Sequence, residues 1–189
     1  MKRAVVCVTV ALLFNALVST AFAGGNANFV LGGRSLDDEQ AWAPFESQHV
    51  LGVTVDFSLQ GSPVQFEAGM QRSRKTESRF GPHFTGGIDE ISFGVNKTWD
   101  LRGRRMHPFA GGGAEELRVV VHGAGNTTAD TSPGLYAHGG IFWRIGRRFN
   151  IGFDGRTVAW TKVHFGGFSF NANYHQLDLL LGWGWPSGR

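Results

Sequence analysis

The chain has 189 residues, 28 of them glycine, and a formal net charge of +3. Lys2 and Arg3 supply two of these charges within the first 23 residues, so the rest of the chain carries about +1. A charge this close to zero does not suggest a nucleic-acid partner. No run of 18 apolar residues follows residue 23, so this part of the sequence predicts no transmembrane helix.

Residues 1–23 have the pattern of a secretory signal. Lys2 and Arg3 precede an apolar run, and Ala21-Phe22-Ala23 has the form of a signal-peptidase cleavage site. The single cysteine, Cys7, lies inside this segment, so the exported chain would have no disulfide. We therefore expect a signal peptide over residues 1–23 and one domain over residues 24–189.

Residues 27–36 and 49–59 predict the first two strands, with a long polar loop between them. In the second of these segments every other residue from Leu51 to Leu59 is apolar, whereas the intervening positions include Asp56. Alternation with a period of two is typical of a strand with one apolar and one polar face.

Residues 64–71 and 87–99 predict the third and fourth strands, which place Glu67 and Glu90 on their polar faces. A short turn precedes the third strand, and a long basic loop over residues 72–85 follows it. On the outer side of a membrane, this loop would meet lipopolysaccharide phosphates, which arginine binds well. The basic residues concerned are Arg72, Arg74, Lys75 and Arg79.

The fifth predicted strand, residues 107–121, is the least regular. The register that places Leu117 on the apolar face also places Glu115 there. A β-bulge near Glu115 and Glu116 would correct this mismatch, because a bulge adds one residue to one strand of a pair. With such a bulge, Glu116 and Arg118 would belong to the polar face.

Residues 134–145, 149–160 and 173–185 predict the last three strands, and the segments 122–132 and 161–170 predict long loops. In the final strand, the apolar face ends in two tryptophans. The connections along the chain thus alternate between long and short.

Eight strands with this alternation predict an all-β fold, a single eight-stranded antiparallel up-and-down transmembrane β-barrel. Strands of about 9–11 residues cross a bilayer when they are tilted. Pairing of the first and last strands would close the ring, and a closed ring satisfies every backbone group in lipid. The rival fold is a soluble lipocalin-like barrel, which would turn its apolar faces inward around a ligand.

The polar faces collect charged side chains that would point into the barrel. An eight-stranded barrel has an interior just wide enough for side chains, so we expect a lumen filled by ion pairs and hydrogen bonds. The alternative is a narrow polar pathway, to which inward-facing glycines would give room. The residues of this predicted luminal network are Arg34, Asp56, Glu67, Glu90, Glu116, Arg118, His138, Arg144, Asp154, Arg156 and Asp178.

The chain resembles the eight-stranded outer-membrane barrels of Gram-negative bacteria, the OmpA, OmpX and OmpW kind. The resemblance rests on the export signal, the strand count, the loop alternation and the final Leu181-Gly182-Trp183-Gly184-Trp185. It implies an outer-membrane location, recognition of the last strand by the barrel assembly machinery, contact with outer-membrane lipid and lipopolysaccharide, and a monomeric state. Residues 186–189 follow the last tryptophan, whereas such families usually end on an aromatic residue.

This resemblance implies a non-enzymatic structural or surface-interaction role with long external loops. One alternative is a narrow conduit or carrier for a small solute. A further alternative is an enzyme that modifies lipid A, which would need a histidine near a carboxylate at the outer rim. The rim candidates are Ser47, His49, His83, His164 and Ser169. Scattered histidines without HExxH spacing predict no metal site, and no motif predicts a cofactor.

Overall fold

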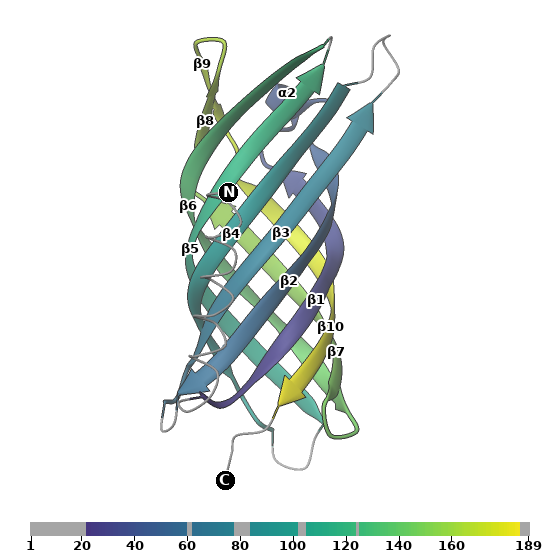
Figure 1. Ribbon diagram of the computed structural model, residues 1–189, viewed down its shortest axis with the longest axis vertical. Coiled ribbons are helices and arrows are strands. Elements are labelled where there is room, and N and C mark those ends of the chain that lie inside the picture. The colour runs from purple at the N-terminus through teal and green to yellow at the C-terminus, as the bar shows by residue number, and fades with distance from the viewer. Residues whose placement is uncertain (1–21, 60–61, 78–83, 102–104, 124, 186–189) are drawn as a thin grey trace, which may run out of the picture.

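The computed structural model describes residues 22–59, 62–77, 84–101, 105–123 and 125–185, apart from the side chains of residues 22 and 23. Eight strands form a closed antiparallel barrel in the order β1-β10-β7-β6-β5-β4-β3-β2, as Figure 1 shows. Within the described ranges, no helix is both long and apolar enough to cross a membrane. The strands of the barrel are β1 (Phe22–Leu36), β2 (Ser47–Leu59), β3 (Gln65–Glu77), β4 (Phe84–Thr98), β5 (Met106–Gly123), β6 (Asn126–Ile145), β7 (Phe149–Ala159) and β10 (Tyr174–Trp185).

The predicted fold class is confirmed. Strands β1 and β10 pair from Gly25 and Trp185 to Leu36 and Tyr174, which closes the ring. Strand β1 begins at Phe22, two residues before the expected cleavage position. Residues 1–21 lie outside the described part of the chain, so the signal peptide stays a prediction.

The two ends of the barrel differ in their connections. The loop end carries the short helix α2 (Glu39–Trp42) and a hairpin of β8 (Lys162–Phe165) and β9 (Phe168–Asn171), both at the top of Figure 1. The Trp42 indole donates a hydrogen bond of 2.6 Å to the Asn171 carbonyl, which ties the first loop to the last. The opposite turn end carries the short connections and the end of β10 (Figure 1).

Three segments predicted as loops are partly or largely strand. Strand β3 continues to Glu77, and β5 and β6 form a continuous ladder up to the pair Gly123 and Asn126. The ladder continues because residues 119–121 and 127–131 are rich in valine and threonine, which favour strands. Residues 161–170 contain the β8–β9 hairpin, whose turn uses two glycines at positive φ.

Through most of the barrel, apolar side chains lie outside and polar side chains inside. On the outer face, Leu51 is 50% exposed and Phe93 is 64% exposed. On the inner face, Asp56 is 5% exposed and Asp178 is 2% exposed. This is the reverse of a soluble protein, in which large charged residues are rarely buried.

At the loop end the arrangement returns to that of a soluble protein. The strands there enclose an apolar plug, the cluster formed by Leu36, Trp42, Ile88, Leu117, Val119, Tyr136, Val158, Val163, Ala172 and Tyr174. A lower apolar cluster of Val30, Phe109, Phe142 and Leu180 lies inside the barrel nearer the turn end. Phe109, Phe142 and Leu180 of this cluster line a small luminal cavity together with polar side chains that include Asp56 and His138.

The predicted bulge in β5 is wrong, and so are the predicted inward positions of Glu116 and Arg118. Strand β5 pairs with β4 and β6 without a register shift. Glu115 therefore points inward and is 5% exposed, whereas Glu116 and Arg118 are exposed on the outer face. The prediction assumed that apolar residues always face outward, but at the loop end Leu117 and Val119 face into the apolar plug.

Candidate functional site

The centre of the lumen is organised around Arg34 of β1. Its guanidinium donates to the Gln176 side-chain oxygen at 2.9 and 2.7 Å and to the Glu90 carboxylate at 2.7 Å. It also stacks over the Tyr174 ring, 3.6 Å from the ring centre. Gln176 and Tyr174 lie on the adjacent strand β10, whereas the contact with Glu90 on β4 crosses the lumen and braces the barrel from within.

A second arginine, Arg156 of β7, completes this part of the network. Its guanidinium lies 2.9 Å from Glu90 and 2.7 Å from Glu115, and it covers the Tyr136 ring at 3.9 Å. In this part of the network each buried charge therefore has an opposite charge in contact, which is the condition for burying charge without a large penalty.

Nearer the turn end, His138 lies between two carboxylates. Its Nε2 is 3.2 Å from Glu67 and its Nδ1 is 3.2 Å from Asp154. The Tyr136 hydroxyl donates to Glu67 at 2.8 Å. This group crosses from β3 through β6 to β7 and fills the lumen below the two arginines.

The structure brings together most of the residues predicted for the lumen. Arg144 lies instead at the turn end of β6, exposed, with its guanidinium 5.9 Å from the centre of the Phe142 ring. Glu116 and Arg118 lie on the outer face. The predicted residues inside the barrel are Arg34, Asp56, Glu67, Glu90, His138, Asp154, Arg156 and Asp178.

Sequence reasoning missed Glu115 and the neutral partners of the network. Counting by twos from His107, with no bulge, would have placed Glu115 inside. The alternation in the last strand already placed Tyr174 and Gln176 on the polar face, but only charged residues were selected. Inward-facing glycines admit large neighbours: a Cβ at Gly94 would collide with the Tyr136 hydroxyl.

Three arginines and an aspartate mark the outer face toward the loop end. Arg72 and Arg74 both bind Asp89, at 2.7 and 2.9 Å. Arg118, directly opposite Asp89 on β5, has no ion-pair partner among the described residues. Arg72, Asp89, Glu116 and Arg118 border a recess of about 360 Å³ whose apolar wall is formed by Leu51, Met70 and Ile91.

Arg72, Arg74 and Lys75 belong to strand β3 rather than to the predicted loop, and Arg79 lies outside the described residues. The alternation of the strand separates them. Arg72 and Arg74 face outward, whereas the Lys75 amine lies 3.3 Å from Glu46 near the loop end. The basic group on the outer face is therefore Arg72, Arg74 and Arg118.

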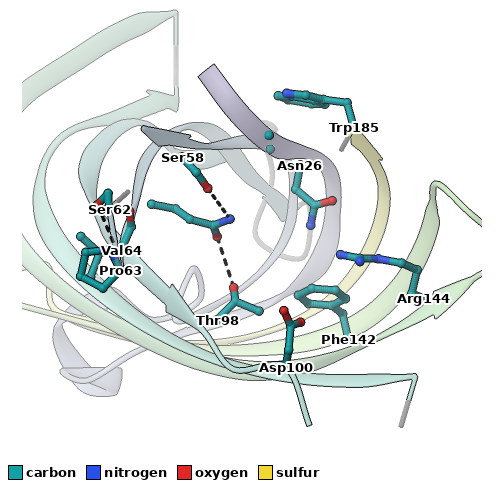
Figure 2. Close-up of a pocket in the computed structure, with 13 residues that line it drawn as sticks. Asn26, Ser58, Ser62, Pro63, Val64, Thr98, Asp100, Phe142, Arg144 and Trp185 are labelled. Atoms are coloured by element: carbon teal, nitrogen blue, oxygen red, sulfur yellow. Dashed lines mark hydrogen bonds between the residues drawn. The ribbon is translucent and has the colours of Figure 1, made fainter. Parts of the chain in front are cut away.

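A polar vestibule of about 310 Å³ opens at the turn end (Figure 2). The Gln65 side chain crosses it, donating to Ser58 at 3.0 Å and accepting from Thr98 at 3.2 Å. Asn26, Arg144 and other polar groups complete its lining. Asn26 and Phe142 line both the vestibule and the small luminal cavity beside Asp56.

The rim groups proposed for an enzyme are mostly isolated. Ser47 and His49 are exposed, and His83 lies outside the described residues. His164 stands opposite Ser169 in the hairpin, and its Nδ1 lies 3.4 Å from Asp130. No hydrogen bond joins His164 to Ser169 among the described residues, so the serine lacks the contact that would activate a nucleophile. Nor does any group of three or more His, Cys, Asp or Glu side chains in the described ranges fit a metal ion.

Asp130 fixes the β8–β9 hairpin to β6. Its carboxylate accepts the backbone amide of His164 at 2.7 Å. This bond and that from the Thr131 amide hold the pKa of the Asp130 carboxyl below its ordinary value. A carboxyl with a lowered folded pKa stabilises the contact above its unfolded pKa and ceases to do so as the pH falls through the folded pKa.

We therefore expect the hairpin to stay attached at neutral pH and to loosen only in acid, below the ordinary range of aspartate. The amide chemical shift of His164, followed by NMR, should titrate with this lowered value and should lose this transition in Asp130→Asn. A transition at the ordinary aspartate value would contradict the assignment.

The closed eight-stranded barrel can be compared with known proteins. No protein-family model matches the chain, and no curated protein matches it in sequence. Among solved structures it is similar to the Neisserial surface protein A (NspA), with 13% identity, a TM-score of 0.57, and coverage of 85% of this chain and 94% of that one.

Two further similar structures have the same fold. The attachment invasion locus protein Ail of Yersinia pestis, in complex with the heparin analogue sucrose octasulfate, has 9% identity, a TM-score of 0.58, and coverage of 86% and 97%. The N-terminal β-barrel domain of OprF of Pseudomonas aeruginosa has 8% identity, a TM-score of 0.55, and coverage of 88% and 100%. The chain thus has the fold of the eight-stranded outer-membrane barrels.

Proposed function

We propose that the chain is a non-enzymatic outer-membrane barrel whose outer face binds lipopolysaccharide and whose loop end faces the cell exterior. The observation that carries this proposal lies on the outer face. There, exposed apolar residues give way, toward the loop end, to the basic group of Arg72, Arg74 and Arg118. An apolar band flanked by polar girdles is typical of barrels in a bilayer. In this orientation the turn end faces the periplasm.

The recess on β2–β5 suits a lipid with an anionic head. Arg118 has no protein carboxylate within ion-pair distance among the described residues, and Arg72 is 66% exposed in its side chain. Leu51, Met70 and Ile91 lie beside them and suit an acyl chain. Arginine binds phosphate through paired hydrogen bonds, so Arg72 and Arg118 suit a lipid A phosphate. The carboxylates of Asp89 and Glu116 also line the recess.

The filled lumen favours this role over a conduit or carrier. The apolar plug closes the loop end, and the ion pairs of Arg34 and Arg156 occupy the centre of the lumen. An enzyme acting on lipid A is less favoured, because Ser169 has no hydrogen bond to His164. Planar-bilayer recordings and lipid A mass spectra test these two alternatives.

The remaining expectations complete the proposal. Residues 1–23 would direct export, and the barrel assembly machinery would insert residues 24–189 into the outer membrane through the final strand. The product would work as a monomer without a cofactor. Among the described residues, the external surface available to a partner includes the β8–β9 hairpin, the α2 loop and the tips of β5 and β6.

Lipopolysaccharide binding by arginine variants tests the proposal. Arg118→Ala should weaken binding by roughly ten- to a hundredfold, because a hydrogen bond to a charged group contributes ~1.5–3 kcal/mol. Adding Arg72→Ala to this variant should weaken lipopolysaccharide binding further. Arg147→Ala, an exposed arginine in the turn after β6, is the matched control.

Affinity can be measured from the shift that added lipopolysaccharide causes in the midpoint of heat-modifiable gel migration. Equal binding by the wild type and the Arg72 and Arg118 variants would refute the proposed lipid site. Purification of the protein from the periplasm as a soluble monomer without detergent would refute the membrane location.

A further inference from the structure

The surface of the turn end is strongly basic. Residues 57–66, 97–107 and 144–150 contain its three turns and the strand ends that these turns join. In the described part of these segments, five basic side chains and one carboxylate give a net charge of +4 (five positive and one negative). Residues 60–61 and 102–104, outside the described ranges, contain no Asp or Glu. The basic residues are Lys97, Arg105, Arg144, Arg147 and Arg148, and the carboxylate is that of Asp100.

Most of this charge is not neutralised within the protein. The Asp100 carboxylate lies 2.7 Å from the Nδ1 atom of His107. The four arginines are exposed, and none of them has a carboxylate within ion-pair distance among the described residues. At the loop end, by contrast, the basic side chains of Arg72, Arg74 and Lys75 all pair with carboxylates. Because unpaired like charges repel one another, the turn end suits an anionic partner.

Arg148 lies where this basic surface meets the outer face of the barrel. Its guanidinium carbon is 5.9 Å from the centre of the Trp183 ring, within the range of a cation–π contact. Trp183 and its cross-strand partner Phe149 are exposed on the outer face, at the bottom of Figure 1, where β7 begins and β10 ends. Tryptophan at the end of an apolar face is typical of a membrane interface, so Arg148 lies at the depth of the lipid headgroups.

A backbone contact fixes Arg148 beside this aromatic pair. The Gly184 amide donates a hydrogen bond of 2.6 Å to the Arg148 carbonyl, which holds the turn after β6 against the end of β10. Arg147 precedes Arg148 in the same turn and is also exposed, but its guanidinium contacts no aromatic ring among the described residues. A site whose groups are already in place binds its ligand with a smaller cost of ordering them. The turn therefore presents one arginine to the membrane interface.

We propose that Arg148 and Trp183 bind the headgroup of an anionic phospholipid, such as phosphatidylglycerol, in the periplasmic leaflet. This site rests on the proposed membrane orientation, in which the turn end faces the periplasm. The guanidinium would bind two phosphate oxygens through paired hydrogen bonds. Trp183 and Phe149 would contact the glycerol and the upper acyl chains, and the other arginines would attract anionic lipid to this edge of the barrel.

The scarcity of carboxylates favours an anionic lipid over a zwitterionic one. The ammonium group of phosphatidylethanolamine would find no free carboxylate beside Arg148 among the described residues, since Asp100 contacts His107. The net charge of +4 at this end also repels an ammonium group and attracts an anion. The outer-face recess differs, because Asp89 and Glu116 line it. The turn end should therefore select lipids by headgroup charge.

Native mass spectrometry of the exported chain in detergent tests the proposal, with phosphatidylglycerol and phosphatidylethanolamine of identical acyl chains as probes. Arg148→Ala should weaken phosphatidylglycerol binding about tenfold or more, because a hydrogen bond to a charged group is lost. The wild type should bind phosphatidylglycerol more tightly than phosphatidylethanolamine by roughly the same factor. Arg148→Ala should leave lipopolysaccharide binding unchanged, so failure of the outer-face site and failure of this site give different results. Heat-modifiable gel migration confirms that each variant is folded.

Arg147→Ala is the matched control, because it removes an equal charge from the same turn. It should weaken phosphatidylglycerol binding by no more than about fivefold, the effect of one charge near an anionic surface. Equal affinities for the two lipids, or equal losses in the Arg147 and Arg148 variants, would overturn the proposal. So would a loss of phosphatidylglycerol binding in the Arg72→Ala/Arg118→Ala double variant alone, which would place the lipid in the outer-face recess. Excess glycerophosphoglycerol should not displace the lipid, and displacement would assign the site to soluble phosphodiesters instead.

Discussion

Replacing Val55 with arginine should lower the free energy of unfolding by about 2–4 kcal/mol, the cost of a lysine or arginine at the bilayer midplane of a barrel. Val55 lies on the outer face of β2, midway along the apolar run from Leu51 to Leu59. A guanidinium there would lie in the most apolar layer of the membrane, and neighbouring outward residues such as Ala68 and Phe93 could not pair with it.

The effect should depend on depth. Leu59→Arg, at the turn end of the same strand, should cost only about 0–1 kcal/mol because the side chain reaches the interface. Urea unfolding in lipid vesicles measures both variants. Equal costs at residues 55 and 59, or no cost at residue 55, would contradict a membrane-spanning outer face.

Glu90→Ala should destabilise the barrel by about 3–5 kcal/mol, the usual cost of removing one partner from a buried ion pair. The Glu90 carboxylate contacts both Arg34 and Arg156, and the side chains on each side of these pairs have essentially no solvent exposure. It also accepts from the Tyr174 hydroxyl. Its loss would leave Arg34 without a buried carboxylate partner and Arg156 with Glu115 alone.

The neighbouring residue provides the control. Asp89 binds two arginines as well, but on the outer face, where the Arg72 side chain is 66% exposed. Exposed ion pairs contribute about 0–1 kcal/mol, so Asp89→Ala should have a small effect. If denaturant unfolding gives similar losses of unfolding free energy for Glu90→Ala and Asp89→Ala, the luminal ion pairs are not what stabilises the barrel.

Much of the fold could be predicted from the sequence, because apolar and polar residues alternate along most strands. In β2, β7 and β10 the apolar face is the outer face, and the residues assigned to the interior, such as Asp56, Asp154 and Asp178, are buried there. This alternation fixes which face of each strand points outward and constrains its register, since a slip of one residue would reverse the two faces.

At the loop end the alternation predicted the wrong side chains as inward-facing, because the interior of the barrel changes there from polar to apolar. Beyond the apolar band the barrel encloses the apolar plug, so Leu117 and Val119 face inward while Arg118 faces outward. A local pattern cannot indicate the height at which this change occurs. The contact between Asp130 and the β8–β9 hairpin was also beyond sequence reasoning, because it joins residues 34 positions apart.

The most direct test of the central claim is spin-label accessibility along β2. The only cysteine, Cys7, lies within the expected signal, so single cysteines can be placed one at a time from residue 51 to residue 58. In lipid vesicles, labels at Leu51, Val53 and Val55 should collide freely with oxygen and poorly with a water-soluble nickel chelate, whereas a label at Asp56 should be shielded from both. The opposite result would be that labels at Val53 and Val55 are shielded from oxygen while a label at Asp56 collides with the nickel chelate. That result would show a soluble barrel and contradict an outer face that is apolar and a lumen that is charged.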